Sequence, residues 1–223
     1  MSEVFTFDAS DAERYADTLA AATAIAAADI DRARAELASV AGALWMGSLK
    51  QAAGSCGVDG TASRRLRDDA LLARVFVRDH FRCTHCGGRV IPRSILVELS
   101  DLFPAEIPYD PHYKRGATHP VYWALGPEAD HVFAHSRGGA FALDNLATLH
   151  AACNTRKADS LAAEPAIRPV GPDGWDGLIS LYPALIGMDA GGARRQYHAR
   201  WGRHYAQATV MTSEAGPGTL FEP

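Results

Sequence analysis

The residues of this chain that are able to do chemistry gather between positions 128 and 159. Asp130 and His131 are adjacent, and Asn154 follows after a turn signal, Ser-Arg-Gly-Gly, at 136–139. On an extended strand the side chains of Asp130 and His131 would point to opposite faces, whereas a bend there would turn both toward one pocket. A carboxylate, an imidazole and an amide oxygen collected in this way suit an oxygen-preferring divalent ion beside a general base.

Two pairs of soft metal ligands accompany this segment, one before it and one within it, and each pair has two residues between its members. Cys83 and Cys86 stand in the C-x-x-C-G form of a zinc knuckle, and His150 with Cys153 repeats the spacing. A single C-x-x-C is also compatible with redox chemistry or simple burial, but two matched pairs favour a closed, structural Cys3His zinc site. His85, inside the knuckle, is an alternative to His150, although the geometry of two pairs favours His150.

The local pattern predicts the elements that must position these groups. A strand should end near the Asp130-His131 pair, and apolar residues over 143–149 predict a return strand after the turn. Residues 153–158 are typical of the beginning of a helix. The unit is therefore strand, loop, strand, helix.

This arrangement resembles the HNH nucleases, also called ββα-metal nucleases. Their pattern has an Asp-His pair or a His on the first strand, an Asn in the loop or second strand, and a His or Asn on the helix. The matching positions here are Asp130-His131, Asn145 and Asn154. The last position holds Asn rather than His, a variant of the family that makes the ligand set richer in oxygen. The family often encloses the motif with two zinc-binding pairs, and the resemblance covers residues 78–159.

The resemblance implies a one-metal hydrolysis of DNA phosphodiester bonds that leaves 5'-phosphate and 3'-hydroxyl ends. His131 would take a proton from the attacking water, while Asp130 and Asn154 would hold a divalent ion, with Mg2+ as the first candidate. Asn145 would orient the loop of His131 through backbone hydrogen bonds. The candidate nucleic-acid contacts are Arg137, Arg156 and Lys157 near the motif, with Arg78 and Arg82 before it.

Charge is unevenly distributed along the 223 residues, whose formal net charge is -4. Residues 61–93 contain eight arginines against three aspartates, so a basic face directly precedes the motif. Such a run alone is more often a solvated helix face, but next to a nuclease-like site we interpret it as a face for nucleic acid.

The amino-terminal region, residues 1–60, is rich in alanine. Ser10 and Glu13 have the spacing of a capping box, which predicts a helix from Asp11. Apolar residues then recur at steps of three and four, on one long helix or on two helices broken near Asp29. This stripe would pack on the nuclease core or on a second copy of the chain, which would make a homodimer through residues 11–50.

The nuclease domain is predicted over residues 61–160, with a helix over 63–80 and an inserted loop at 99–127. The insertion follows a short amphipathic helix over 95–103 and mixes aromatic with basic residues. It would contact nucleic acid, or it would wrap the fold with its aromatic rings buried. His119 within it is expected to be a core or surface histidine rather than a metal ligand.

The predicted fold class is α+β, a mainly helical chain around a small ββα-metal core with a zinc knuckle. A helical extension should occupy residues 161–211, with helices over 175–188 and 193–208, before a disordered tail at 212–223. A composition of 48% hydrophobic residues without a membrane span or leader predicts a cytoplasmic protein. Three of the four cysteines at ligand positions favour a reducing compartment, with Cys56 as a free thiol.

These features together favour a metal-dependent DNA endonuclease, with bacterial antiviral defence or restriction as its setting. The alternative is a zinc-stabilised module that binds nucleic acid or assembles without cleaving. A pure zinc frame has no need of the Asp-His pair and Asn154, and this favours the enzyme. A protein partner that selects the target is compatible with either function.

Overall fold

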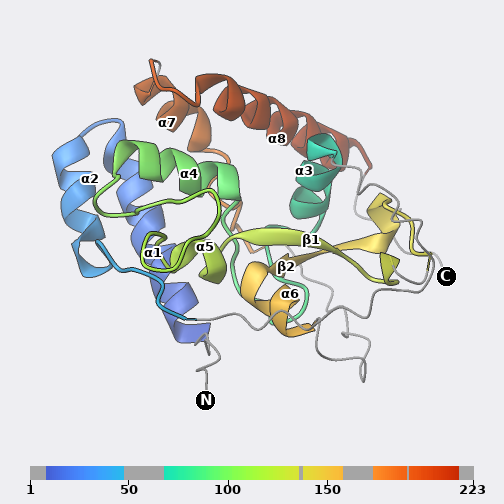
Figure 1. Ribbon diagram of the computed structural model, residues 1–223. Helices are drawn as coiled ribbons and strands as arrows, with labels where there is room; N and C mark the ends of the chain where they lie inside the picture. Colours follow the sequence, from blue (N-terminus) through green and yellow to red (C-terminus); the bar gives the residue numbers. More distant parts are fainter. Residues whose placement is uncertain (1–8, 48–67, 136–137, 158–172, 190, 216–223) are drawn as a thin grey trace.

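A computed structural model describes residues 9–47, 68–135, 138–157, 173–189 and 191–215. Within these ranges, helices surround a small sheet of two strands (Figure 1). The α+β class predicted for the chain is therefore confirmed. In the same ranges, no helix combines the length and the apolar character that a bilayer span requires.

The sheet and the helix after it form the predicted ββα unit. Strand β1 (Pro127–His131) pairs antiparallel with β2 (Leu146–His150), in a register that sets His131 opposite Leu146. Helix α6 (Ala151–Lys157) follows β2 without a linker. The return strand begins later than expected because the 3-10 turn η3 (Leu143–Asn145) occupies its first residues. All five residues of β2 are buried, so the sheet is anchored through this strand.

Helix α3 (Asp69–Arg78) packs against the sheet and leads into the knuckle. It begins at Asp69 because the carboxylate of Asp68 caps it, accepting 3.0 Å hydrogen bonds from the amides of Ala70 and Leu71. The earlier part of the predicted helix, through residue 67, lies outside the described residues. At the other end, the Asp79 carboxylate accepts a 2.8 Å hydrogen bond from the amide of Thr148 in β2. This bond fixes the helix to the sheet.

The amino-terminal stripe lies on two helices, α1 (Ala9–Ala26) and α2 (Ile30–Glu36), followed by η1 (Leu37–Ser39). The break near Asp29 is confirmed, because its carboxylate caps α2 with a 2.9 Å bond from the Arg32 amide. Glu13 of α1 accepts hydrogen bonds from the backbone amide and the guanidinium group of Arg89.

Alanines of this stripe are fully buried within the chain, where α1 packs on α2 and on α5 (Val121–Ala124). Of the two alternatives for the stripe, packing inside the chain is the one observed. Figure 1 shows α1 and α2 beside α4 and α5. The predicted linker around Cys56 lies outside the described residues.

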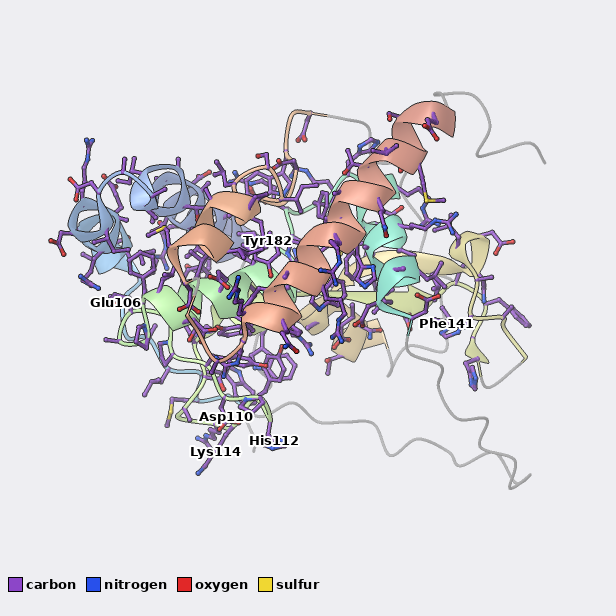
Figure 2. All side chains as sticks on the ribbon, turned by 90° about the horizontal axis from the view of Figure 1, so that it is seen from above. Glu106, Asp110, His112, Lys114, Phe141 and Tyr182 are labelled. Carbon is purple, nitrogen blue, oxygen red and sulfur yellow. The ribbon has the colours of Figure 1, made fainter. Side chains whose placement is uncertain are left out.

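The insertion wraps the fold and buries its rings. Helix α4 (Arg93–Leu102) is almost entirely covered, and Tyr122 behind it is fully buried. Ring centroids of Tyr109 and Tyr122 are 4.9 Å apart, and those of Tyr113 and Trp123 are 5.1 Å apart. The aromatic rings of the insertion are therefore part of the hydrophobic core. Polar residues project from the outer edge of the loop in Figure 2, namely Asp110, His112 and Lys114.

His119 is a core histidine, as predicted. Its Nε2 donates to the carbonyl of Val40 at 2.7 Å, and its Nδ1 accepts from the amide of Val121 at 3.2 Å. Burial lowers the pKa of His119 to about 4. The neutral ring thus joins the insertion to the amino-terminal helices.

The carboxy-terminal extension forms α7 (Tyr182–Met188) and α8 (Arg195–Ala215), and α8 runs along α3 and α4 (Figure 1). The helix predicted over 175–188 starts only at Tyr182, because the Asp176 carboxylate accepts from the amides of Leu178 and Ser180 and shapes a turn. At its other end α8 continues to Ala215, past the predicted start of the tail at 212.

Candidate metal centre and active site

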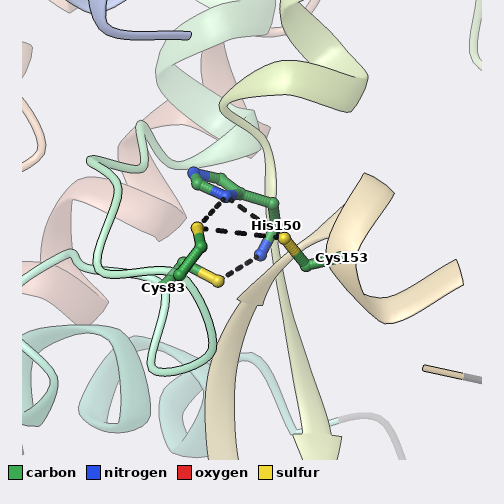
Figure 3. A group of neighbouring side chains, drawn as sticks. Cys83, His150 and Cys153 are labelled. Carbon is green, nitrogen blue, oxygen red and sulfur yellow. Dashed lines mark hydrogen bonds between the residues drawn. The ribbon is translucent and has the colours of Figure 1, made fainter. Parts of the chain in front are cut away.

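Four side chains converge where the knuckle meets the end of β2 (Figure 3). Their ligand atoms all lie within 4.8 Å of one another, in the set Cys83, Cys86, His150 and Cys153. The Cys86 Sγ is 3.4 Å from His150 Nδ1 and 3.9 Å from Cys153 Sγ. A tetrahedral zinc ion with Zn–S of about 2.3 Å and Zn–N of about 2.0 Å requires separations of about 3.5–3.8 Å. The donor set and its spacing fit structural zinc.

Glycine makes the knuckle possible. Gly87 has a φ of +79° and donates a 2.7 Å hydrogen bond to the carbonyl of Cys83, which closes the turn. A Cβ at Gly88 would lie 2.9 Å from the His150 ring. The second pair is placed by the switch from strand to helix, because His150 ends β2 and Cys153 lies in the first turn of α6.

The orientation of His150 suits it to be the fourth ligand of a metal ion. Its Nε2 donates to the carbonyl of Arg89 at 2.9 Å, so that Nδ1 faces the sulfurs with its lone pair. His85, the alternative ligand, is exposed and lies outside the cluster.

The three cysteines of the cluster differ in the pKa of their thiols. A hydrogen bond from Cys153 lowers the pKa of Cys83 to about 3, and a hydrogen bond from Cys153 also lowers the pKa of Cys86. The same contacts raise the pKa of Cys153. Thiolates are the form that binds zinc, so the cluster is prepared for a cation.

Asn154, the next residue of α6, is tied to β1. Its Nδ2 donates a 2.6 Å hydrogen bond to the Glu128 carboxylate, whose other oxygen is 3.9 Å from Arg93. Because only the NH2 group of the amide is able to donate, this contact fixes the orientation of the amide and leaves Oδ1 as the acceptor atom. Sequence reasoning did not single out Glu128. The alternation of side chains on β1, which puts Glu128 and Asp130 on one face, was the available signal.

Asp130 and His131 occupy the last two positions of β1, opposite Ala147 and Leu146. Pairing is regular through His131, so alternation favours opposite faces for the two side chains, and the chain bends only afterwards. The ring of His131 packs against the rings of His135, at 5.4 Å between centroids, and Phe141, at 5.9 Å. The direct contact between β1 and the predicted helix ligand runs through Glu128.

Asn145 closes the loop that follows His131. Its Oδ1 accepts from the amide of Phe133 at 2.8 Å, while its Nδ2 donates to the carbonyls of Phe133 and Ala140 at 3.1 and 2.9 Å. A Cβ at Gly139 would lie 1.9 Å from the Phe133 carbonyl, so this loop requires glycine there. These are backbone hydrogen bonds of the kind expected for Asn145.

Two of the basic candidates, Arg78 and Arg82, contact acceptors within the chain. Arg78 donates to both carboxylate oxygens of Asp79 and to the carbonyl of Leu146 at 2.6 Å, and its side chain is only 16% exposed. Arg82 donates to the carbonyl of Gly87 and to the carboxylate of Asp173. Their guanidinium groups bind acceptors of the chain itself. Two of these acceptors, Leu146 and Asp173, lie far along the sequence and reach the arginines only in the folded chain. Both arginines stabilise the fold through these contacts, and their predicted contacts with nucleic acid stay predictions.

The other three basic candidates lie wholly or partly outside the described residues. Arg137 lies outside the described residues. Arg156 and Lys157 end α6, but their side chains are also outside the described part of the chain. Their predicted contacts with nucleic acid stay predictions.

One comparison with known proteins bears on this unit. The family model described as HNH endonuclease matches residues 126–160, which span β1, the loop, β2 and α6. No curated protein and no solved structure matches the chain significantly. The ββα unit of this chain is therefore similar to the HNH endonuclease family over residues 126–160, a similarity that indicates nuclease activity in general.

Proposed function

We propose that the protein is a metal-dependent endonuclease that hydrolyses DNA phosphodiester bonds at its ββα unit. The observation that carries the proposal is the 2.6 Å hydrogen bond between Asn154 and Glu128. It orients an amide oxygen between β1 and α6, and a module that needed only its zinc frame would have no use for that orientation. The alternative without cleavage is therefore the weaker one.

The donor set on β1 and α6 suits a hard divalent ion such as Mg2+. Asp130 offers a carboxylate and Asn154 the Oδ1 that its bond to Glu128 leaves open. When bound there, the ion would supply positive charge for the phosphate oxygens and the leaving 3'-oxygen. Such oxygen ligands distinguish this site from the neighbouring Cys3His cluster, whose Cys153 precedes Asn154 on α6.

His131 is the proposed general base. It would accept the proton of the attacking water at an imidazole nitrogen, with Phe141 and His135 limiting the rotation of the ring. An in-line displacement needs the water and the leaving oxygen on opposite sides of phosphorus. The side chains of Asp130 and His131 point in different directions, so His131 would act on the side of the attacking water and Asp130 on the side of the leaving oxygen. Breaking the bond between phosphorus and the 3'-oxygen leaves 5'-phosphate and 3'-hydroxyl ends.

Asn145 is proposed as a positioning residue. By holding the backbone at Phe133 and Ala140, it would limit the movement of the chain that follows His131. Contacts with phosphate would fall to Arg137, Arg156 and Lys157, next to the motif in the sequence.

The proposed setting is the defence of a bacterial cytoplasm against foreign DNA, with a partner protein as one means of selecting the target. The alanine stripe is already covered by the chain's own helices, so a homodimer through residues 11–50 would have to use other faces of α1 and α2. The domain limits predicted at 60, 160 and 211 stay part of this proposal.

Cleavage of supercoiled plasmid tests the proposal. With Mg2+, Mn2+ or Ni2+, His131→Ala should cut more slowly than the parent by a factor on the order of a hundred or more, because it lacks the base. His112→Ala removes an exposed histidine of the insertion and should cut at the parental rate. Equal rates for His131→Ala and the parent would reject the assignment. Binding of DNA by the parent without cleavage under all three ions would support the alternative.

A further inference from the structure

A second group of ligand-type side chains lies between α4 and α8, outside the HNH domain. The ligand atoms of Glu98, Asp101 and His198 lie within 4.8 Å of one another. His198 Nε2 is 3.0 Å from Glu98 Oε2 and 3.3 Å from Asp101 Oδ2. Glu98 and Asp101 are three residues apart on α4, so they share one helix face, and His198 approaches it from the first turn of α8.

His198 is held as metal-binding histidines are. Its Nδ1 is 2.7 Å from the hydroxyl of Tyr182, which in turn donates to the carbonyl of Ser94 at 3.5 Å. Because the Tyr182 hydroxyl donates its proton to the Ser94 carbonyl, its oxygen accepts a hydrogen bond from Nδ1–H of His198. The lone pair of His198 Nε2 then faces the two carboxylates. Three electron-rich atoms then converge, and a cation between them would resolve their repulsion.

Glu98 provides the independent observation. Its side chain is 1% exposed, and apart from His198 Nε2, 3.0 Å from Oε2, its carboxylate oxygens have no polar partner in the described part of the chain. Burial and the charges of Asp189 and Asp101 raise the pKa of Glu98 to about 7. Buried carboxylates are normally paired, hydrogen-bonded or bound to metal.

The charges around the cluster are unbalanced. Glu98 and Asp101 come from α4, and Asp189 follows α7 near enough to raise the pKa of Glu98. On the positive side, Arg194 donates to Oδ1 of Asp101, which leaves Oδ2 facing His198. With His198 neutral, three carboxylates face one guanidinium, and a divalent ion would restore neutrality.

We propose that Glu98, Asp101 and His198 bind a divalent transition-metal ion that ties α8 to α4. Two carboxylates and one imidazole favour Mn2+, Fe2+ or Zn2+ over a soft ion. Asp101, at 18% exposed, is the side from which an ion would enter. This site shares no residue with the zinc cluster or with the proposed nuclease centre, so it stands or falls independently of the proposed function.

Counting bound Mn2+ by the EPR signal of the free ion tests the site. The zinc-loaded full chain would carry Asp130→Ala, which removes a ligand of the proposed nuclease ion. This protein should bind one Mn2+ per chain, and adding Glu98→Gln should abolish binding. Asp110→Asn changes a half-buried carboxylate of the insertion and should leave one Mn2+ in the same background. No binding before Glu98→Gln is added, or equal binding after it, would overturn the proposal.

Thermal unfolding separates ion binding from simple packing. Without metal, Glu98→Gln should be at least as stable as the parent, because it removes a buried charge that has no polar partner except His198 among the described residues. Saturating Mn2+ should raise the Tm of Asp130→Ala by an amount on the order of 5 °C and leave that of Asp130→Ala with Glu98→Gln unchanged. If Glu98→Gln lowers the Tm without metal while Mn2+ shifts neither protein, the cluster is a purely internal network and the proposal fails.

Discussion

The Nδ2 of Asn154 on α6 donates a 2.6 Å hydrogen bond to the carboxylate of Glu128 on β1. The contact spans the two elements that carry the proposed ligands of the nuclease ion. It determines which atom of the amide is presented, since a carboxylate accepts hydrogen bonds only from the NH2 side. Glu128 therefore acts on the site through Asn154.

Replacing Glu128 should consequently weaken the use of the divalent ion more than it weakens the fold. We expect Glu128→Ala to need roughly 10–100-fold more Mg2+ for half-maximal cleavage, the usual cost of losing a residue that orients a ligand. Cleavage rates measured against Mg2+ concentration check this. Glu128→Gln retains an acceptor oxygen and should fall between alanine and the parent. An unchanged Mg2+ dependence in both variants would show that the pair does not orient the ligand.

Loss of the zinc cluster should unfold the ββα unit. Cys153→Ser removes one of four ligands, and structural zinc contributes an apparent ~10 kcal/mol or more in small zinc modules. The variant should contain much less zinc by elemental analysis and should lose its cooperative thermal transition, as should the parent treated with a strong chelator. His85→Ala is the matched control, because that histidine lies outside the cluster. Full zinc content in Cys153→Ser would contradict the assignment.

Stability should fall with acid through His119. The pKa of this histidine is lowered by burial to about 4, against 6.5 ordinarily, so only the unfolded chain takes up the proton between these values. The contribution is therefore complete above pH 6.5 and is lost as the pH falls toward 4, by about 3 kcal/mol in all. Urea unfolding at pH 7 and pH 5 measures it. His119→Gln should be less stable at pH 7 but should show a shallower decline, and an equally steep decline would implicate other groups.

We expect Arg78 to stabilise the folded state. Arg78→Ala leaves the Leu146 carbonyl and the Asp79 carboxylate without their charged donor, which should cost about 2–3 kcal/mol in urea unfolding. Arg78→Lys should recover little, because an ammonium group lacks the planar fork that reaches both acceptors. Arg203→Ala on the exposed side of α8 should change stability very little. Parental stability in Arg78→Ala, with weaker binding to DNA, would restore the original interpretation of this arginine.

Local patterns were sufficient to predict the ββα unit and the Cys3His cluster that could hold zinc. The spacing of Cys83 with Cys86 and of His150 with Cys153 is set by a tight turn and by one helical turn, so short-range geometry determines it. The same is true of the break at Asp29, which is a capping side chain three residues from its partner.

Contacts between distant segments were not predictable in this way. Arg78 meets Leu146 across 68 residues and Arg82 meets Asp173 across 91, and an arginine run has the same sequence signature whether it faces solvent or protein. The cluster of Glu98 with His198 likewise depends on how α8 folds back on α4. Hydrophobic periodicity predicts that such helices exist, but not which polar residues meet between them.

Cys153 and Asn154 are consecutive residues of α6, so a soft-metal ligand and a proposed hard-metal ligand are separated by about 100° of one helix turn. A rigid helix transmits any displacement of the first residue to the second. A substitution that distorts the Cys3His cluster would therefore also displace the amide that is proposed to hold the nuclease ion, so we expect the two positions to tolerate change only together.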